Sequence, residues 1–446
     1  MSIAGTKAPY GVIAGLGRSG FSCARYLHGR GWRLAVTDTR AAPPQLRQLA
    51  ELDAAIPVRL GGLDLRLLAG ADCVVASPGL SLHEPFFEEA RRLGLEIVGD
   101  IELFARAAAA PVVGITGTNG KSTVTTLIAN MAGRAGLKVR VGGNLGEPAL
   151  DLLREGTELY VLELSSYQLE TTASLSCRAA TVLNVSPDHL DRYATLASYA
   201  AAKARIFARC DTAVINLDDP LVVAMPRTAR RTLSFSLRAS IGADYAVAEE
   251  GGQWWLVRGH ERLMPLSRMK IKGLHNAANA LAALALGEAL GLPKPAMLAE
   301  LESFPGLAHR SQWVADVAGV SYIDDSKGTN VGATLAAVAG MDGPLVMIVG
   351  GDGKSQDFAP LAAAFRGKVR HAVLIGRDGP QLARCLSGVC SLETAASLPE
   401  AVRAAARAAR PGDTVLLSPA CASLDMFRDY AHRGAVFAES VRELAA

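Results

Sequence analysis

The chain has 446 residues, which is enough for about three domains. Half of the residues are apolar, a fifth are charged, and the formal net charge is only +3. This balance is ordinary for a globular protein and gives no electrostatic reason to expect nucleic acid or an anionic membrane as a partner.

The cysteines and the first residues indicate a reducing compartment. The seven cysteines are odd in number and no pair has C-x-x-C spacing, so free and mostly buried thiols are expected. The opening MSIAGTKAPYG lacks the apolar core of a signal peptide, and no apolar run is long enough to span a bilayer. We therefore expect a cytoplasmic protein with no membrane partner.

Short β-branched runs alternate with Ala/Leu-rich stretches along the chain, which predicts parallel α/β sheets. The first predicted strand, residues 10–14, runs into GLGRSG at 15–20, and a helix follows to about Gly29. Further strands are predicted at residues 32–37, before Asp38, and at residues 73–76, before Ser77. We expect residues 1–105 to form an N-terminal Rossmann-like domain.

A second unit starts after a connector at residues 105–110. Its first predicted strand, residues 112–116, enters GTNGKST at 117–123, and a helix follows to about Arg134. Strands are predicted at residues 159–164, 180–185 and 212–216, a hairpin at 253–265, and a long helix at about 276–290. This pattern predicts a central P-loop-type ATPase domain over residues 106–309.

The last unit carries predicted strands at residues 345–349, 372–375 and 414–417. Each is followed by a polar or glycine-rich turn. Because open parallel sheets bind ligands at the carboxyl ends of their strands, the chemistry is expected in these turns. We expect residues 310–446 to form a C-terminal Rossmann-like domain.

The sequence at 117–123 is the strongest local signal for a phosphate loop. Glycines let backbone N–H groups turn toward phosphate oxygens, Lys121 adds a charge, and the following helix adds its positive end. A hydroxyl of the loop can join a Mg²⁺ ion. The nucleotide-binding residues expected from this loop are Gly117, Thr118, Asn119, Gly120, Lys121, Ser122 and Thr123.

One feature departs from the usual G-x-x-x-x-G-K-[ST] pattern. That pattern needs glycine at position 115, where this chain has Ile115, and glycines stand at 114 and 117 instead. The alternative interpretation is a plain glycine turn with a solvated lysine. The position directly after a predicted strand favours the phosphate loop.

Several blocks of the chain resemble the Mur ligases, which add amino acids to the muropeptide precursor of the cell wall. TGTNGKST at 116–123 is similar to their phosphate loop, and to that of the folylpolyglutamate synthases. LELSSYQL at 162–169, NVSPDHLDR at 184–192, YAAAK at 199–203 and HR at 309–310 continue the resemblance. DDSKGTN at 324–330, GGDGKS at 350–355 and SPACASLD at 418–425 extend it through the last domain.

Within that family the last domain distinguishes the members. DSKGTN, GGDGKSQDF and SPACASLDMF resemble the members that add D-glutamate, whereas the D-N-P-R motif of the diaminopimelate adders is absent. GLGRSG is shared with the L-alanine adders, so it does not by itself distinguish them from the D-glutamate adders. The resemblance implies an ATP-dependent ligase acting on UDP-N-acetylmuramoyl-L-alanine and D-glutamate in cytoplasmic peptidoglycan synthesis, and hence in cell shape and division. We expect a monomer.

The resemblance also implies two Mg²⁺ ions, held by Ser122, Glu163, His189 and Lys203. A carboxylate at a strand end beside a phosphate loop suits this hard cation. Lys203 would carry a carbamate, formed from CO₂ and the neutral amine. On the residues alone, Glu163 is an ordinary strand-end carboxylate, His189 an ordinary hydrogen-bonded histidine and Lys203 a solvated helix lysine.

The carboxylates that flank His189 leave two interpretations open. Asp188 and Asp191 could orient a ligating imidazole or help to place the second ion. They could also serve the structure alone, which is the simpler interpretation.

The remaining site residues are carried over from the resemblance. Lys121, His189, Lys203 and Arg310 are expected to be catalytic, with Asn279, Arg310 and Asp325 at the adenine, the phosphates and the ribose. The UDP end of the substrate would be bound near Ser19, Asp38, Thr39, Arg40 and Ser77, and the rest of it near Asn144, Ser165 and Gln168. D-glutamate would be bound by Lys327, Thr329, Lys354 and Ser423, a set of cations and hydroxyls suited to two carboxylates. Tyr430 stands where the family is expected to have phenylalanine.

The expected chemistry is activation of the L-alanyl carboxylate as an acyl phosphate, followed by attack of the amine of D-glutamate. Positioning and charge neutralisation would supply most of the rate. Three alternatives are weaker. GLGRSG with Asp38 could indicate a dehydrogenase, but this leaves the phosphate loop unexplained. A folylpolyglutamate synthase would lack the separate N-terminal unit, and a non-catalytic nucleotide-binding regulator would need no metal cluster.

Overall fold

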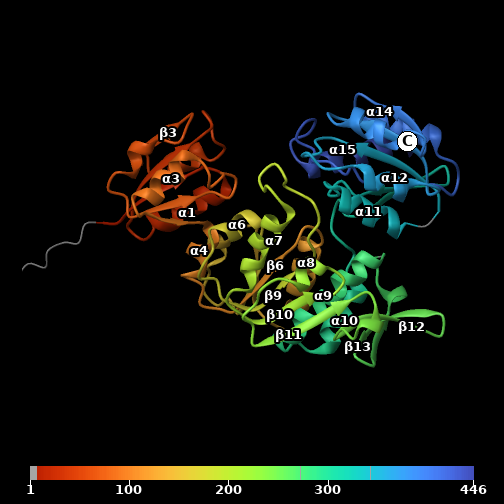
Figure 1. Ribbon diagram of the computed structural model, residues 1–446, viewed down its shortest axis with the longest axis horizontal. Coiled ribbons are helices and arrows are strands. Elements are labelled where there is room, and N and C mark those ends of the chain that lie inside the picture. Colours follow the sequence, from red (N-terminus) through yellow and green to blue (C-terminus); the bar gives the residue numbers. More distant parts are fainter. Residues whose placement is uncertain (1–7, 272, 342, 446) are drawn as a thin grey trace, which may run out of the picture.

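The computed structural model describes residues 8–271, 273–341 and 343–445 and consists of three α/β domains, each built on its own sheet (Figure 1). The N-terminal domain (red to orange) and the C-terminal domain (blue) both contact the central domain and lie apart from each other. Within the described ranges, no helix is long and apolar enough to cross a membrane.

The N-terminal domain is a parallel sheet of five strands in the order β3-β2-β1-β4-β5. Its strands are β1 Tyr10–Ala14, β2 Arg33–Asp38, β3 Val58–Leu60, β4 Cys73–Ala76 and β5 Glu96–Val98. Its helices are α1 Arg18–His28, α2 Leu46–Leu52, α3 Pro85–Arg92 and α4 Asp100–Ala105. Helix α1 packs so closely on the end of β1 that a Cβ at Gly20 would lie 1.9 Å from the carbonyl oxygen of Gly15. The GLGRSG sequence is therefore needed for this tight turn.

The central domain is a nine-stranded sheet in the order β14-β13-β12-β11-β10-β9-β6-β8-β7. It is parallel from β7 to β12, and β13 and β14 add an antiparallel extension. The strands are β6 Val112–Thr116, β7 Val139–Gly143, β8 Leu159–Glu163, β9 Cys177–Val182, β10 Cys210–Asn216, β11 Arg231–Ser236, β12 Tyr245–Glu250, β13 Gln253–Arg258 and β14 Glu261–Pro265. The helices are α5 Lys121–Arg134, α6 Ser166–Glu170, α7 Leu196–Ala204, α8 Pro220–Val223, α9 Leu274–Leu290 and α10 Lys294–Ser303.

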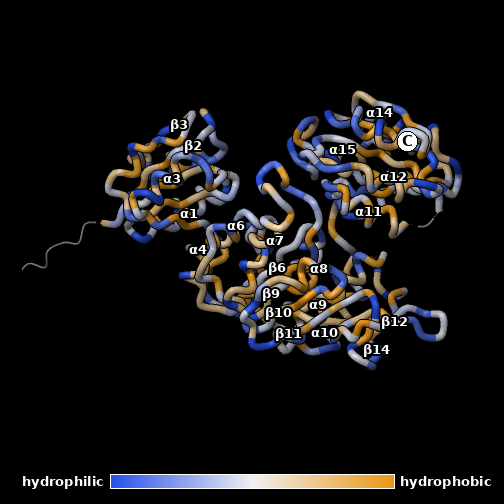
Figure 2. The backbone as a smooth tube through the Cα atoms, in the orientation of Figure 1, coloured by the Kyte–Doolittle hydropathy of each residue, from blue (hydrophilic) through white to orange (hydrophobic). Residues whose placement is uncertain are grey.

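Helix α9 forms the middle of the central core. A helix that is apolar on all sides must be buried, and every residue from Ala280 to Leu286 is at most 1% exposed. In Figure 2 this helix is strongly hydrophobic and crosses the sheet beside α10. Because α9 packs against both α5 and the strands, it fixes the helix that follows the phosphate loop.

The C-terminal domain is a six-stranded sheet in the order β15-β16-β20-β17-β18-β19, parallel except for β15. Its strands are β15 Gln312–Val317, β16 Val320–Asp324, β17 Leu345–Gly350, β18 Val369–Ile375, β19 Ser391–Thr394 and β20 Thr414–Leu417. Its helices are α11 Val331–Gly340, α12 Ala359–Phe365, α13 Gly379–Leu386, α14 Leu398–Ala408 and α15 Tyr430–Ala445.

The predicted class, three α/β domains with Rossmann-like outer domains and a P-loop-type centre, is confirmed. Each sheet lies within one of the spans 1–105, 106–309 and 310–446, while the exact boundaries stay predictions. The strand predicted at residues 180–185 begins earlier and ends at Val182. Cys177 already pairs with Cys210 of β10, which sets the earlier start.

Candidate active site

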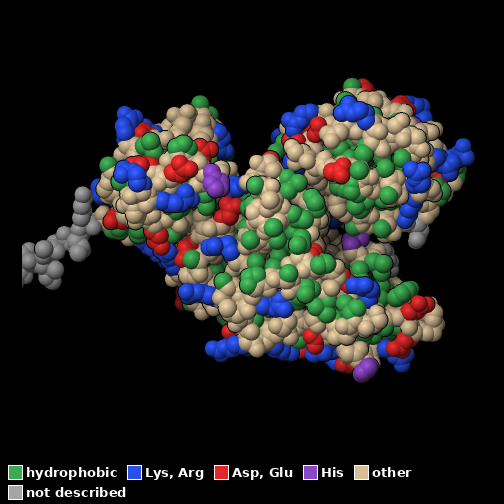
Figure 3. Space-filling model, in the orientation of Figure 1, with side chains coloured by type: hydrophobic (Ala, Val, Ile, Leu, Met, Phe, Trp, Pro, Cys, Tyr) green, Lys and Arg blue, Asp and Glu red, His purple; other side chains and the backbone are tan. Residues whose placement is uncertain are grey.

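Three clefts open at the carboxyl ends of the strands and share lining residues. The N-terminal cleft and the central cleft have Asn144 in common, and the central cleft and the nucleotide-side cleft have Asn119, Gly120, Arg310 and Lys327 in common. Figure 3 shows the molecule hollowed between the central and C-terminal domains. The clefts therefore adjoin one another, and together they are lined by residues of all three domains.

Most of the predicted residues line these clefts. The N-terminal cleft contains Ser19, Asp38, Thr39, Arg40, Ser77, Asn144 and Gln168. The central cleft contains Thr118, Asn119, Gly120, Lys121, Ser122, Asn144, Glu163, Ser165, His189, Lys203, Arg310, Lys327, Thr329 and Lys354. The nucleotide-side cleft contains Thr123, Asn279 and Asp325. The two remaining residues, Gly117 and Ser423, do not line these three clefts.

The phosphate loop is a tight turn between β6 and α5. Gly120 has φ +83°, and a Cβ there would lie 2.4 Å from Oδ1 of Asn279 on α9, so only glycine fits. The Lys121 ammonium donates to the carbonyl oxygens of Gly117 at 3.0 Å and Thr118 at 2.9 Å. Burial lowers the pKa of Lys121. The cation and the start of α5 thus point into the same space, as phosphate binding requires.

A carboxylate stands beside this loop. Glu163 ends β8, the neighbour of β6, and accepts hydrogen bonds at 2.6 Å from Ser122 Oγ and at 2.6 Å from Asn144 Nδ2. Burial by itself would raise the pKa of Glu163, but the charge of Lys121 and these two bonds outweigh it and lower the pKa. A charged carboxylate next to a loop hydroxyl is a donor set that suits Mg²⁺.

Arg310 reaches this point from the hinge between the central and C-terminal domains. Its Nη2 donates to Ser122 Oγ at 2.7 Å, although the two residues are 188 positions apart. Burial in the cleft lowers the pKa of the Arg310 guanidinium. The chain therefore holds a desolvated cation where an anionic ligand would meet the phosphate loop.

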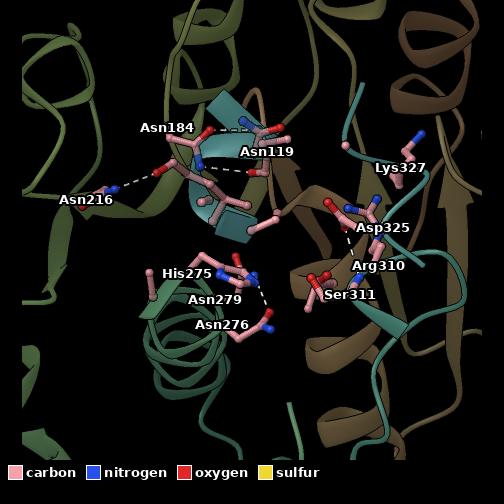
Figure 4. A pocket seen from close by; sticks show the side chains of 18 of the residues that line it. Asn119, Asn184, Asn216, His275, Asn276, Asn279, Arg310, Ser311, Asp325 and Lys327 are labelled. Atoms are coloured by element: carbon pink, nitrogen blue, oxygen red, sulfur yellow. Dashed lines mark hydrogen bonds between the residues drawn. The ribbon is translucent and has the colours of Figure 1, made fainter. Parts of the chain in front are cut away.

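Figure 4 shows the nucleotide-side cleft, with the asparagines of α9 on one side and the hinge residues on the other. Asp325 accepts from the backbone N–H of Ser311 at 3.1 Å and from Ser418 Oγ at 2.7 Å. Burial raises the pKa of Asp325 to about 7. Asp325 and Asn279 thus face each other across a space lined on both sides by polar groups.

His189 is held by a tyrosine. Its Nδ1 lies 2.7 Å from the Tyr167 hydroxyl, whereas its Nε2 lies 3.8 Å from Asp188. Asp188 therefore makes no hydrogen bond to the imidazole, because the second distance is beyond hydrogen-bonding range. Burial lowers the pKa of His189 to about 4. The ring is neutral at physiological pH, which is the form that binds metals.

Lys203 is 1% exposed, so the solvated lysine expected from the residues alone is wrong. Its Nζ donates to the carbonyl oxygen of Gly117 at 2.9 Å and lies 4.4 Å from the centre of the Tyr199 ring. Burial, and then the charge of Lys121, lower the pKa of Lys203 well below its usual value. The chain thus keeps an amine that loses its proton easily directly behind the phosphate loop.

The N-terminal cleft contains Asp38 at the end of β2. Asp38 already accepts from the backbone N–H of Leu16 at 2.6 Å and of Arg40 at 2.8 Å, and from Arg40 Nη2 at 2.7 Å. Burial alone would raise its pKa, but these bonds lower it to about 2. Both oxygens are occupied by the protein. This arrangement does not favour the ribose contact that the dehydrogenase alternative needs.

The C-terminal domain contributes two lysines to the central cleft. The Lys354 ammonium pairs with Asp188 at 2.6 Å. Lys327 Nζ lies 3.8 Å from the ring centre of Tyr430, and burial lowers the pKa of Lys327 to about 8. Ser423 lies beyond β20, is 4% exposed and stands outside the cleft walls.

Two asparagines that were not among the predicted site residues also shape the site. Asn184 brackets the phosphate loop, because its Oδ1 accepts from the N–H of Asn119 at 2.8 Å and its Nδ2 donates to the carbonyl of Asn119 at 3.1 Å. Asn330 comes from the C-terminal domain and contacts Asn119 and Asp188. The signal available was their position, in the turns after β9 and β16.

Among the described residues, no group of three or more His, Cys, Asp or Glu side chains lies close enough together to hold a metal ion. Glu163 and His189 therefore do not form a metal site with other side chains of these types alone. Any such site would need hydroxyls, water or a modified lysine as additional ligands.

Comparison with known proteins agrees with this geometry. Three family models match the chain in order: "Mur ligase MurD-like, N-terminal domain" at residues 10–99, "Mur ligase middle domain" at 115–287 and "Mur ligase, glutamate ligase domain" at 309–421. The chain belongs to the Mur ligase family. This Mur ligase is 51% identical to the UDP-N-acetylmuramoylalanine–D-glutamate ligase of Methylococcus capsulatus, over 97% of the chain and 95% of the relative. It is also 51% identical to the enzyme of that name from Pseudomonas aeruginosa, over 97% and 98%.

Solved structures show the same fold at low identity. A pseudomurein peptide ligase type C from Methanothermus fervidus matches with a TM-score of 0.63 at 18% identity, over 98% of this chain and 100% of that one. The UDP-N-acetylmuramate-alanine ligase of Thermotoga maritima matches with a TM-score of 0.62 at 19% identity, again over 98% and 100%. The resemblance inferred from the motifs is therefore confirmed over nearly the whole Mur ligase chain.

Proposed function

We propose that this Mur ligase uses ATP to join D-glutamate to UDP-N-acetylmuramoyl-L-alanine in peptidoglycan precursor synthesis. The named activity of the curated relatives supports this function, at 51% identity over 97% of the chain. The observation that carries it is the adjacency of the three clefts. The N-terminal cleft, the phosphate loop and the C-terminal cations adjoin one another through shared lining residues, and a three-substrate ligase needs its substrates side by side in this way.

The N-terminal cleft suits the UDP end of the muramoyl substrate. Its lining of loop glycines, Thr39 and Arg40 offers hydroxyl and cationic donors for diphosphate and ribose, and the Ser77 hydroxyl, which donates to the Gly15 carbonyl at 2.7 Å, can accept a hydrogen bond. Asn144 stands where this cleft meets the central one. We infer that the L-alanyl carboxylate enters the central cleft past Asn144, next to the phosphate loop.

The phosphate loop and the boundary between the central and C-terminal domains supply the cations that would neutralise the phosphate charge. Lys121 and Arg310 approach the space above Ser122 from two domains, and both would neutralise the transferring phosphoryl group of ATP. Transfer to the L-alanyl carboxylate forms an acyl phosphate and releases ADP. Attack by the amine of D-glutamate then expels phosphate. Lys121→Ala should abolish ligation even at saturating ATP.

The donor set also suits Mg²⁺. We infer that Glu163 and Ser122 hold one ion, and that His189 with a modified Lys203 holds a second. Bound Mg²⁺ supplies charge stabilisation to the phosphoryl oxygens. Lys203 is suited to become a carbamate because its buried amine is neutral more readily than a usual lysine. The amine attacks CO₂, loses a proton, and becomes an anionic oxygen ligand.

Lys327, Thr329 and Lys354 are the proposed partners of the two carboxylates of D-glutamate. Ser423 is retained in this set only as a prediction, since it is buried and does not line the cleft. We also propose that the enzyme acts in the cytoplasm, where ATP and the precursor are available, and that it works as a monomer. Chromatography with light scattering would test the oligomeric state.

The test of the function is product formation with purified protein. ATP, Mg²⁺, UDP-N-acetylmuramoyl-L-alanine and D-glutamate should yield ADP, phosphate and a product heavier by one glutamyl residue, measured by mass spectrometry. Omitting any one substrate should abolish the product. ATP turnover without a glutamyl product would refute the proposed ligation.

A further inference from the structure

Asp188 of the central domain is held by two side chains of the C-terminal domain. Its Oδ1 accepts from Lys354 Nζ at 2.6 Å and its Oδ2 accepts from Asn330 Nδ2 at 3.3 Å. Asp188 is 6% and Asn330 3% exposed. Breaking a buried ion pair leaves an uncompensated charge, so this contact favours the arrangement in which both domains are seated together.

The carboxylate of Asp188 does not hydrogen-bond to the neighbouring imidazole. Tyr167 binds the His189 ring at 2.7 Å, whereas Asp188 lies 3.8 Å from it. The one bond of Asp188 to its own loop is to the backbone N–H of His189, at 2.9 Å. Its hydrogen bonds to other side chains therefore go to the C-terminal domain and not to the imidazole of His189.

Asn330 extends this contact to the phosphate loop. Its Oδ1 accepts from the N–H of Ala333 at 2.8 Å and caps helix α11. Its Nδ2 donates to Asn119 Oδ1 at 3.1 Å as well as to Asp188. Asn330 and Asp188 thereby link the phosphate loop to Lys354 through hydrogen bonds, of which the one between Asn330 and Asp188 is buried.

The backbone at both ends of the ion pair is strained. Lys354 has φ +49°, and His189, next to Asp188, has φ +57°. Residues other than glycine keep such conformations only where their surroundings impose them, and these positions concentrate at functional sites. The N–H of Lys354 donates to Asp352 Oδ1 at 3.0 Å, which fixes the loop in this conformation.

We propose that Asp188 is the positioning residue for the amino-acid acceptor, acting through Lys354 and Asn330. An ammonium has three donors, so one bond to Asp188 leaves two for a carboxylate of the acceptor. Asp188 thus holds the Lys354 ammonium at the central cleft before D-glutamate binds. This inference rests on the proposed ligase function. It adds a residue that affects the binding of D-glutamate but not that of ATP or the UDP substrate.

Asp188→Asn tests the proposal, because it keeps the shape of the side chain and removes its charge. The KM for D-glutamate should rise at least tenfold, while the KM values for ATP and the UDP substrate stay within twofold. The acceptor-independent step, measured as label exchange between ADP and ATP with the UDP substrate present, should keep its rate. Asp188→Glu should recover part of the acceptor affinity. Glu249→Gln, which removes an exposed carboxylate on β12 of the same domain, is the matched control and should change no KM by more than twofold.

The outcomes separate this inference from the function on which it rests. Wild-type enzyme that does not ligate D-glutamate would refute the function itself. If the wild type ligates and Asp188→Asn leaves the KM for D-glutamate within twofold, the positioning role is wrong. A rise in the Mg²⁺ requirement with unchanged acceptor affinity would also overturn it and assign Asp188 to the metal. Loss of label exchange together with loss of thermal stability would identify a merely structural residue, and would equally overturn the proposal.

Discussion

Replacing Arg310 by methionine should remove most of the activity without harming the fold. The guanidinium crosses the domain boundary and donates to Ser122 Oγ at 2.7 Å, beside the carboxylate of Glu163. Burial already lowers the pKa of Arg310, so keeping this guanidinium charged in the cleft costs the protein solvation free energy. Such a charge is expected to be compensated when the phosphates bind.

The magnitude follows from the position of the cation. Two unit charges about 4 Å apart attract by about 4 kcal/mol at an effective dielectric constant of about 20. Since about 1.4 kcal/mol corresponds to a factor of ten in rate, Arg310→Met should lower kcat roughly a thousandfold. The midpoint of thermal unfolding without ligands should not fall, because a poorly hydrated charge is removed together with a single hydrogen bond.

The assay is phosphate release at saturating concentrations of all three substrates, with thermal unfolding of the same samples. Arg366→Met, at an exposed position of the C-terminal domain, is the matched control and should behave as wild type. A loss of kcat of less than tenfold in Arg310→Met would refute the role given to this charge. A lower unfolding midpoint would show that Arg310 serves the fold.

Three further predictions follow from burial and close packing. Lys203→Ala should be almost inactive in phosphate release and should recover in part with added short carboxylates, and failure of every such acid would count against a carbamate. Gly20→Ala should destabilise the protein by several kcal/mol in urea unfolding, because its Cβ would lie 1.9 Å from the Gly15 carbonyl oxygen. In Gly17→Ala the new Cβ would have no atom within 4 Å, so this variant should lose little stability. Equal losses of stability in the two variants would contradict this packing. The pKa of Asp325 in the folded state is about 7, above its value near 3.9 in the unfolded chain. Between about pH 4 and pH 7 the folded state therefore keeps a proton that the unfolded chain loses. The stability contributed by this group falls as the pH rises through that range. Asp325→Asn cannot ionise, so its stability relative to wild type should increase by roughly 2–3 kcal/mol from pH 5 to pH 8, and a decrease would refute the shift.

Local signals in the sequence predicted the phosphate loop and its neighbours well. The loop, the strand before it and the helix after it are contiguous, and glycines, lysine and hydroxyls at fixed spacing are enough to identify them. The short strands β3, β5 and β19 were not predicted, and their three or four residues carry little periodicity. The longer strands β7, β11, β12, β15 and β16 were not predicted either.

The environment of a side chain was harder to predict than its identity. Lys203 has the spacing of an ordinary helix lysine, and only the packing of α7 under the phosphate loop buries it. The contact between Asp188 and Lys354 joins residues 166 positions apart in two domains, and no local pattern contains it. Ser423 shows the opposite case, because it belongs to a motif in the expected order and yet is buried and does not line the cleft.

The central claim is that the acceptor is D-glutamate, and its most direct test is competition. Purified enzyme, ATP and UDP-N-acetylmuramoyl-L-alanine would be incubated with D-glutamate, L-glutamate, L-alanine, L-lysine and diaminopimelate together, and the ligated products separated by mass and stereochemistry. The account predicts that the D-glutamyl product dominates, because inverting the α-carbon moves the amine or a carboxylate away from its partner. A dominant product from any other amino acid in the mixture would contradict it.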